Sequence, residues 1–355
     1  MKCYINGIGV ISPQRTHVNS EFLPEIKNYH NNILTSVTPD FKVYLSPVQL
    51  RRLSRMLRIG MTAATICLED AGIKVPNGIV TATGYGFLEE TEKFLKELLE
   101  RNEKQLTPTY FMQGTYNALA GLVALSVKCT GYNNTYVSKG FAFENALQDC
   151  MLRLNEDRNL NLLLGSYDES AAVQYTAGMR EHQFKTEPTN SLDIFKNKTD
   201  GCVQGESSCF FALSGQQAAS TWCHVEGVRL IYLPDSADDL KSAINTFLEN
   251  HSIRLSEIDL VVSGMSGCKS RDQLLENVEN TLFVNNPVAY FKHLCGEFCT
   301  ATSFGMWLAA SILKKQTIPQ IVRASAHNFP DQVDNILLVN HYFNRNYSLM
   351  LLRRK

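Results

Sequence analysis

Strand-like and helix-like segments alternate along the whole chain, and this alternation is the feature that most constrains its fold. The run Tyr4–Ile11 reads as a buried strand, whereas Gln49–Ala71 has apolar residues at helical spacing. Strands that alternate with helices are typical of α/β proteins with mainly parallel sheets covered on both faces. The pattern starts again after Ser214–Ala219 without a Gly/Ser-rich linker. We therefore predict two closely packed halves, residues 1–215 and 216–355.

The charge and the longest apolar segment exclude two classes of partner. The formal net charge over 355 residues is −1, which gives no basic surface for nucleic acid. The segment Cys299–Leu313 is the longest apolar helix that we predict, and it is too short to cross a bilayer. The start MKCYINGIGVIS lacks the pattern of a secretory signal. We expect a cytoplasmic protein that binds neither nucleic acid nor membrane.

Cysteine usage agrees with that location. The ten cysteines are scattered, and most lie in apolar runs such as Ile66–Leu68. Such cysteines usually behave as small buried hydrophobic residues, and disulfides are rare in cytosolic proteins. We interpret them as buried and reduced.

One short stretch, AYFKHLCGEFCTATSFG, concentrates chemically active side chains. It holds Lys292, His293, Cys295, Glu297 and Cys299 within eight residues. A structural zinc site normally needs a second ligand pair elsewhere, and the chain has no C-x-x-C or H-x-x-x-H. A Cys/His catalytic pair needs a base held from a distant part of the chain. On composition alone, buried cysteines at the start of a core helix are the leading interpretation.

The spacing of this stretch resembles the K-x-x-x-G-H-x-x-x-A-x-G segment of β-ketoacyl-acyl-carrier-protein synthases, in the thiolase-like superfamily. Lys292 takes the lysine place and Gly296 the glycine place. The segment Tyr4–Pro13 looks like the opening strand of that family, and Asp200–Leu213 (DGCVQGESSCFFAL) is similar to its R-D-G-F-V-x-G-E-G-A-G-x-L-x-L. Gly131–Asp168 follows the frame from the nucleophile strand to the later G-G-A-E. The resemblance implies a duplicated five-layer α/β/α/β/α fold, usually dimeric.

At the positions where this family carries its catalytic residues, the chain departs from the pattern. The nucleophile position falls on Gly140, or on Val137 in a shifted frame, and the two histidine positions fall on Gly264 and Glu297. Lys292 alone is retained. Glycine has no nucleophile, and a carboxylate has the wrong sign for stabilising an enolate. The resemblance therefore implies no condensation by the usual mechanism, and we expect Lys292 and Glu297 to neutralise one another.

Three functions stay open. The first is a catalytically degenerate, chain-length-factor-like partner of an active ketosynthase in fatty-acid or polyketide synthesis. The second is an acyltransferase or hydrolase with a remodelled site built on Cys295, Cys299 or Ser138. The third is a homodimeric scaffold that binds acyl chains. None of the three requires a cofactor or metal.

Partners follow from the same resemblance. An acyl carrier protein is the expected ligand, and the densest basic group is Arg51, Arg52 and Arg55, which a solvated helix face explains equally well. The strand Asn134–Ser138 is expected to pair across a dimer axis, with an active ketosynthase or with a second copy. The segment 107–113 is expected to be a loop that reaches the neighbour. The dimer and pocket positions that we predict are Phe111, Met112, Thr135 and Val137.

Overall fold

The computed structural model describes residues 2–196, 198–324 and 328–355. Ten strands form one continuous mixed sheet with the order β3-β2-β4-β5-β1-β6-β10-β9-β7-β8. The strands are β1 Cys3–Ile11, β2 Gly78–Thr83, β3 Tyr132–Val137, β4 Asn161–Asp168, β5 Ser207–Ser214, β6 Cys223–Tyr232, β7 Leu260–Ser263, β8 Val288–Tyr290, β9 Asn335–Tyr342 and β10 Asn346–Arg353.

The helices fill the connections between these strands. They are α1 Pro47–Arg52, α2 Arg55–Ala71, α3 Leu88–Glu100, α4 Pro108–Gly114, α5 Ala118–Val127, α6 Ala142–Glu156, α7 Ala172–Arg180, α8 Ala237–Asn250, α9 Gln273–Thr281, α10 Lys292–Cys295 and α11 Thr302–Lys315. Among the described residues, no helix is long and apolar enough to span a membrane.

The strand order repeats within the sheet. Reading inward from each edge, β3-β2-β4-β5-β1 has the same order and the same parallel and antiparallel pairings as β8-β7-β9-β10-β6. The two sets meet where β1 and β6 pair over three residues. The predicted α/β duplication is confirmed, although the sheet is mixed rather than mainly parallel. Within each set the antiparallel pairs arise because the last strand, β5 or β10, runs opposite to both of its neighbours. The boundary between residues 215 and 216 stays a prediction.

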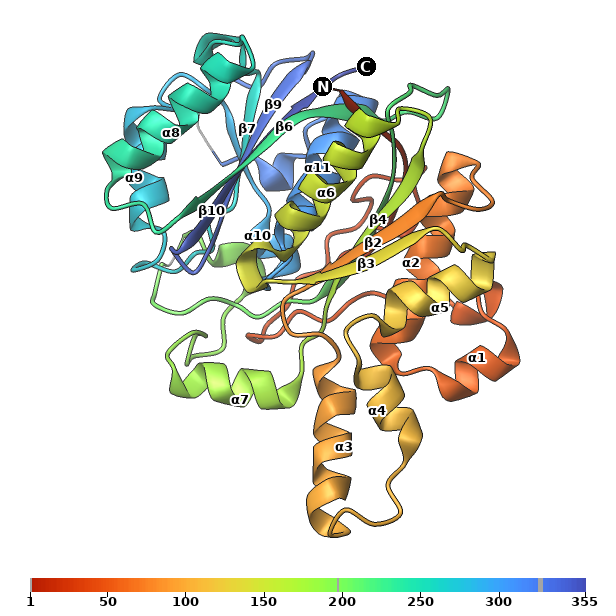
Figure 1. Ribbon diagram of the computed structural model, residues 1–355. Coiled ribbons are helices and arrows are strands. Elements are labelled where there is room, and N and C mark those ends of the chain that lie inside the picture. The colour runs from red at the N-terminus through yellow and green to blue at the C-terminus, as the bar shows by residue number, and fades with distance from the viewer. Residues whose placement is uncertain (1, 197, 325–327) are drawn as a thin grey trace.

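The molecule has five layers, because both faces of each set of strands are apolar and each face is covered by helices. Helices α6 and α11 lie between the two sets of strands, α2 and α5 cover one outer face, and α8 and α9 cover the other (Figure 1). Successive side chains of a strand point to opposite faces. Accordingly Leu162 and Leu164 of β4 join the central core, whereas Leu163 joins the core under α2 and α5. Strands buried on both faces explain the continuous apolar runs in the sequence.

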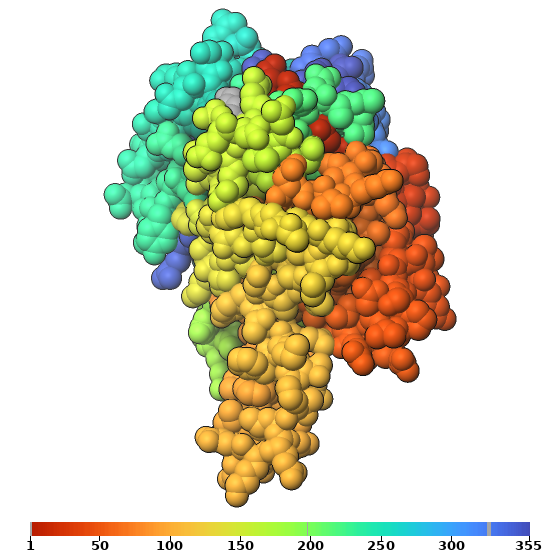
Figure 2. Space-filling model, turned by 45° about the vertical axis from the view of Figure 1, so that its right-hand side comes forward, coloured from red at the N-terminus to blue at the C-terminus, as the bar shows by residue number. Residues whose placement is uncertain are grey.

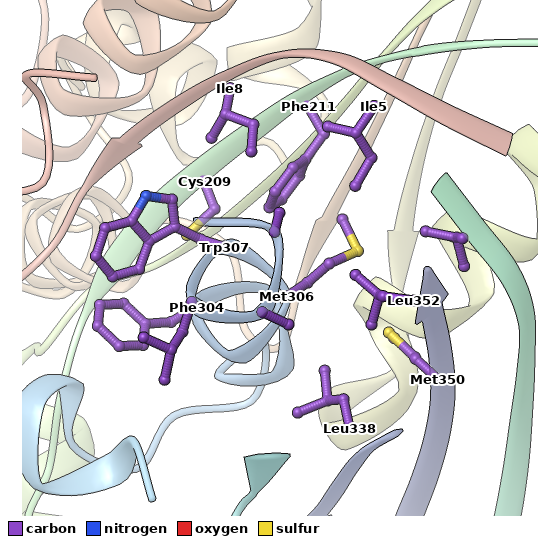
Figure 3. Close-up of a cluster of buried hydrophobic side chains, with 14 of the residues drawn as sticks. Ile5, Ile8, Cys209, Phe211, Phe304, Met306, Trp307, Leu338, Met350 and Leu352 are labelled. Carbon is purple, nitrogen blue, oxygen red and sulfur yellow. The ribbon is translucent and has the colours of Figure 1, made fainter. Parts of the chain in front are cut away.

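Helix α11 is the centre of the molecule. Every residue from Thr302 to Leu313 is buried. Figure 3 shows its Phe304, Met306 and Trp307 among side chains from strands of both sets. The strand residues labelled there are Ile5, Ile8, Cys209, Phe211, Leu338, Met350 and Leu352. One helix therefore ties the two sets of strands together.

Local capping explains a difference from the expected helix Gln49–Ala71. The structure divides this segment into α1 and α2, because Ser54 is extended and its side chain accepts a hydrogen bond from the Leu57 amide. Serine at this position is a strong start signal for a helix. Gly72, with φ of +68°, ends α2 in the left-handed conformation that glycine adopts without strain.

Candidate functional site

The turn from β3 into α6 holds the position that the resemblance assigns to the nucleophile. Gly140 is buried in a short 3₁₀ turn, Lys139–Phe141. A cavity of about 1020 Å³ lies beside this turn, with walls from the segments that follow β2 and β3, from α7, and from the ends of β6, β9 and β10. Its lining includes Tyr85, Ser138, Lys139, Arg271, Tyr342 and Arg345.

The space next to Gly140 is taken by Tyr342, the last residue of β9. A Cβ atom at position 140 would lie 2.6 Å from the Tyr342 Cβ and 2.7 Å from its Cδ1. Tyr342 is buried, and its hydroxyl hydrogen-bonds with Tyr85 and with the Cys299 thiol. A side chain at position 140 therefore requires Tyr342 to move.

The first histidine position is filled in the same way. A Cβ atom at Gly264 would lie 2.0 Å from the Oδ1 atom of Asn340. The Asn340 Nδ2 donates to the Thr302 hydroxyl at 2.6 Å, which in turn donates to a Glu144 oxygen at 2.6 Å. Asn340 and Tyr342 are two residues apart on β9, so they point to the same face. One strand thus fills the space beside both glycines.

Lys292 and Glu297 form the expected ion pair. The Lys292 Nζ lies 2.8 Å from the Glu297 Oε2, both side chains are buried, and Nζ also donates to the His341 carbonyl oxygen at 2.6 Å. Burial raises the pKa of Glu297, and the neighbouring Lys292 and His341 act in the opposite direction. Because the Lys292 ammonium is engaged within the protein, it does not face the cavity as a free cation.

The alternative nucleophiles are poorly activated. Cys295 and Cys299 are fully buried, and burial raises the pKa of both thiols well above the usual value. The thiolate is the reactive form of cysteine. Ser138 lies on the cavity wall, where its hydroxyl accepts a hydrogen bond from the Asn145 amide at 2.9 Å. An amide does not remove a proton from serine, so this contact does not activate it.

His293, which is adjacent to Lys292, is held in the core. Its Nε2 lies 3.1 Å from the Ile321 carbonyl oxygen, and its ring packs edge-on against Phe195. Burial lowers the pKa of His293 to about 4, so the ring is neutral at pH 7. Within the described ranges, no group of three or more His, Cys, Asp or Glu side chains is arranged to hold a metal ion.

A buried His–Asp pair near the site was missed in the sequence. The His341 Nε2 lies 3.0 Å from the Asp272 Oδ1, while its Nδ1 accepts from the Asn344 amide at 3.2 Å. Because Nδ1 accepts from this amide, Nε2 is the ring nitrogen that donates to the Asp272 carboxylate. Burial alone would raise the pKa of Asp272, but the hydrogen bonds and charge of His341, together with Ser266, hold it below the usual value. This pair fixes the turn that carries Gly264.

The three arginines predicted as a basic docking group differ in their surroundings. Arg55 forms a bidentate ion pair with buried Glu206, with Nη1 2.9 Å from Oε2, whereas Arg51 and Arg52 are exposed on α1. Arg55 is thus a structural residue, and the three arginines are not one exposed group. Such a pair is not visible in the sequence, because the partners are far apart along the chain.

The segment 107–113 is not the loop that we expected. Pro108–Gly114 forms α4, which packs against α3 as a projecting hairpin. Phe111 and Met112 are 59% and 66% exposed on it. The prediction of a loop was wrong, because proline is favourable at the first position of a helix.

The other two predicted dimer residues belong to β3. The Thr135 hydroxyl forms hydrogen bonds with the side chains of Thr81 and Asn117, and Val137 is partly exposed at the end of the strand.

Comparisons with known proteins agree with this architecture. Residues 30–201 match the profile of the β-ketoacyl synthase N-terminal domain. The ishigamide ketosynthase/chain length factor superposes with a TM-score of 0.80 at 15% identity, covering 100% of this chain and 99% of the other. Part of the N-terminal half thus matches a β-ketoacyl synthase domain, and the whole chain has the fold of the ketosynthase/chain length factor structure.

Two further structures have the same fold. A β-ketoacyl synthase from Burkholderia phymatum gives a TM-score of 0.76 at 14% identity, with 100% and 99% coverage. A ketosynthase in complex with its chain length factor from Xenorhabdus doucetiae gives 0.74 at 14% identity, with 100% and 98% coverage. At these identities the likeness shows the fold of the chain and no more. None of the curated protein sequences matches it significantly.

Proposed function

We propose that this ketosynthase-like chain is catalytically degenerate and acts as a chain-length-factor-like partner of an active ketosynthase in acyl chain synthesis. The observation that carries the proposal is the apolar, exposed edge of the N-terminal half. Leu125 on α5 is 77% exposed, and Tyr116 and Val137 are also exposed. Large exposed apolar patches mark interaction sites, and the edge of a sheet can pair with another chain.

This edge lies on one face of the molecule. β3 is the last strand of the sheet, and α5, which packs on it, is apolar around its whole circumference. Figure 2 shows this region in yellow on the face turned forward, with the α3–α4 hairpin projecting beneath it. The hairpin that projects beneath this region in Figure 2 carries the exposed Phe111 and Met112. A partner that covers β3 and α5 would also contact the hairpin.

The site geometry supports a role without chemistry of its own. Position 140 carries no side chain, the space beside positions 140 and 264 is filled from β9, and Glu297 is paired with Lys292. Loss of the residues that act together in a catalytic site lowers activity by orders of magnitude. A homodimer of this chain would contain two such sites, whereas a heterodimer would leave one intact site in the partner.

An acyl carrier protein is part of the same proposal. The cavity lining has three cationic side chains, Lys139, Arg271 and Arg345, and one acidic side chain, Glu181. A rim with this charge favours an acidic ligand or partner. One structure with the same fold contains a type II polyketide synthase acyl-carrier protein in complex with its ketosynthase. The ten free thiols favour a cytoplasmic location.

Co-expression with candidate ketosynthases and acyl carrier proteins tests the proposal. We expect a 1:1 complex by native mass measurement, condensation only when the partner is present, and a changed product length with Phe111→Ala. Leu125→Asp should abolish the complex, and Val284→Asp, an exposed apolar position in the C-terminal half, should leave it intact. A chain that stays monomeric, or homodimeric beside every ketosynthase, rejects the chain-length-factor role; a homodimer that retains acyl chains instead supports an acyl-binding scaffold.

A further inference from the structure

Two buried thiols meet where the N-terminal and C-terminal halves contact each other below the cavity. Cys202 follows a short bridge between Thr199 and Cys268, and the Lys269 amide donates to the Thr199 carbonyl oxygen at 3.1 Å. The Cys202 and Cys268 side chains are hydrogen-bonded to each other. The two sulfurs therefore lie side by side although their residues come from different halves of the chain.

The surroundings make the two thiols unequal. The hydrogen bond with Cys202 lowers the pKa of Cys268 well below the usual value, with further help from Ser270 and from the amide and charge of Arg271. The same contact and burial raise the pKa of Cys202. Cys268 is the one cysteine of the described chain whose pKa is lowered. An activated thiolate beside a second thiol is the arrangement found in thiols that oxidise reversibly.

Arg271 lies between the cavity and the Cys202 sulfur. Arg271 lines the cavity, and its Nη1 lies 3.8 Å from the Cys202 sulfur and 3.1 Å from the Gln183 carbonyl oxygen. Its guanidinium also stacks over the Phe343 ring, 4.1 Å from the centroid. Both cysteines are fully buried behind this side chain. Because both thiols are buried, we expect a small oxidant to reach them more readily than a bulky tripeptide disulfide.

We propose that Cys202 and Cys268 are a modification site, at which hydrogen peroxide converts the two thiols into a disulfide between the halves of the chain. The Cys268 thiolate attacks one peroxide oxygen, the O–O bond breaks, and hydroxide leaves and takes up a proton as water. The Cys202 sulfur then displaces the hydroxyl group of the Cys268 sulfenic acid. The S–S bond forms, and the second water leaves with the Cys202 proton. One peroxide is reduced by two electrons for each disulfide.

The disulfide would restrain a functionally placed turn. Cys268 lies between Gly264 and Asp272, in the turn that His341 holds, and Arg271 from the same turn lines the cavity. Cys202 lies in the segment that also bonds to the Lys185 and Gln183 backbone. Oxidation therefore fixes the cavity wall to the N-terminal half, and this inference does not depend on the proposed function.

Peptide mapping of the purified full-length chain under non-reducing conditions tests the site. After hydrogen peroxide we expect a Cys202–Cys268 cross-link with the loss of two of the ten thiols, restored by dithiothreitol, and little reaction with glutathione disulfide. Cys268→Ser should abolish the cross-link. Cys202→Ser should leave a sulfenic acid at Cys268 that dimedone traps. Cys129→Ser, which removes the one cysteine that is not buried, should leave the cross-link unchanged.

Two results overturn the inference. One is a folded wild-type chain that keeps both thiols in peroxide while Cys129 is oxidised. The other is a cross-link that persists in Cys268→Ser through a different cysteine. The wild-type measurement decides the question even if a serine variant fails to fold.

Discussion

The two halves of the sheet have the same strand order but end in different edges. At the N-terminal edge, β3 has six residues and carries the exposed apolar helix α5. At the C-terminal edge, β8 has three residues, and the following chain covers it through an Ala289–Arg323 bridge and a 2.9 Å hydrogen bond from the Ala324 amide to Val288. Natural proteins block sheet edges that must stay unpaired. The same topology therefore has one closed edge and one edge available to a partner.

The two halves also contribute unequally to the central site. Gly140 lies in the N-terminal half and Gly264 in the C-terminal half, yet Tyr342 and Asn340 of β9 fill the space beside both. The buried ion pair of Lys292 and Glu297 belongs to the C-terminal half as well. The N-terminal half thus carries the exposed sheet edge, and the C-terminal half provides the side chains that fill the central site.

The largest expected effect concerns the open edge. Leu125→Asp or Val137→Asp places a charge in the proposed interface, and we expect loss of the complex because an unpaired buried charge is strongly unfavourable. Val284→Asp, near the closed edge, is the matched control and should change neither assembly nor the free energy of unfolding. Analytical ultracentrifugation measures the result. Equal loss of assembly at both edges would remove the distinction between them.

The second effect concerns the buried ion pair. Lys292→Met leaves Glu297 buried without its partner, and we expect the free energy of unfolding to fall by about 3–5 kcal/mol. The double variant Lys292→Met/Glu297→Met should recover most of that loss, because apolar replacements of buried pairs are often nearly neutral. Urea denaturation of the single and double variants measures both values. A single variant as stable as the wild type would show that the pair does not hold the C-terminal site closed.

The sequence predicted the layers well, because a buried strand and an amphipathic helix each have a local pattern. It also placed Lys292 and Glu297 together, since they are five residues apart. Tyr342 and Asn340 could not be found in this way, because only the folded sheet brings β9 against the two glycine turns. The error at Pro108–Gly114 was avoidable, since Thr107-Pro108 is a helix start. Features with a local sequence pattern could therefore be predicted, whereas contacts between segments far apart in the chain could not.

The third prediction compares one carboxyl group from each half, the buried Glu169 and the half-buried Glu279. Burial raises the pKa of Glu169 to about 8 and that of Glu279 to about 7, from an ordinary value of 4.5. The folded state then binds more protons than the unfolded state, so stability is lost as the pH rises from about 4.5 through these values. Each pKa unit corresponds to about 1.4 kcal/mol, so Glu169→Gln should flatten the pH profile more than Glu279→Gln. Denaturation between pH 5 and 8 measures the total loss of stability in each variant; the two groups differ mainly above about pH 7, where Glu279 is already ionised in the folded state, and equal total losses would contradict the order.

The smallest expected effect concerns Gly140, where the two halves touch. In Gly140→Cys the new Cβ must displace the Tyr342 ring, and we expect the free energy of unfolding to fall by about 1–3 kcal/mol, as in other overpacked sites. Intact-mass analysis with acyl-loaded carrier protein should show at most slow acylation and no condensation, because Gly264 and Glu297 supply no histidine. Gly140→Cys/Tyr342→Ala is the control that restores space beside the new thiol; it should speed acylation without restoring condensation, although loss of the buried Tyr342 ring lowers stability in its own right. Fast acylation of the single variant would show that Tyr342 does not close the N-terminal side of the site.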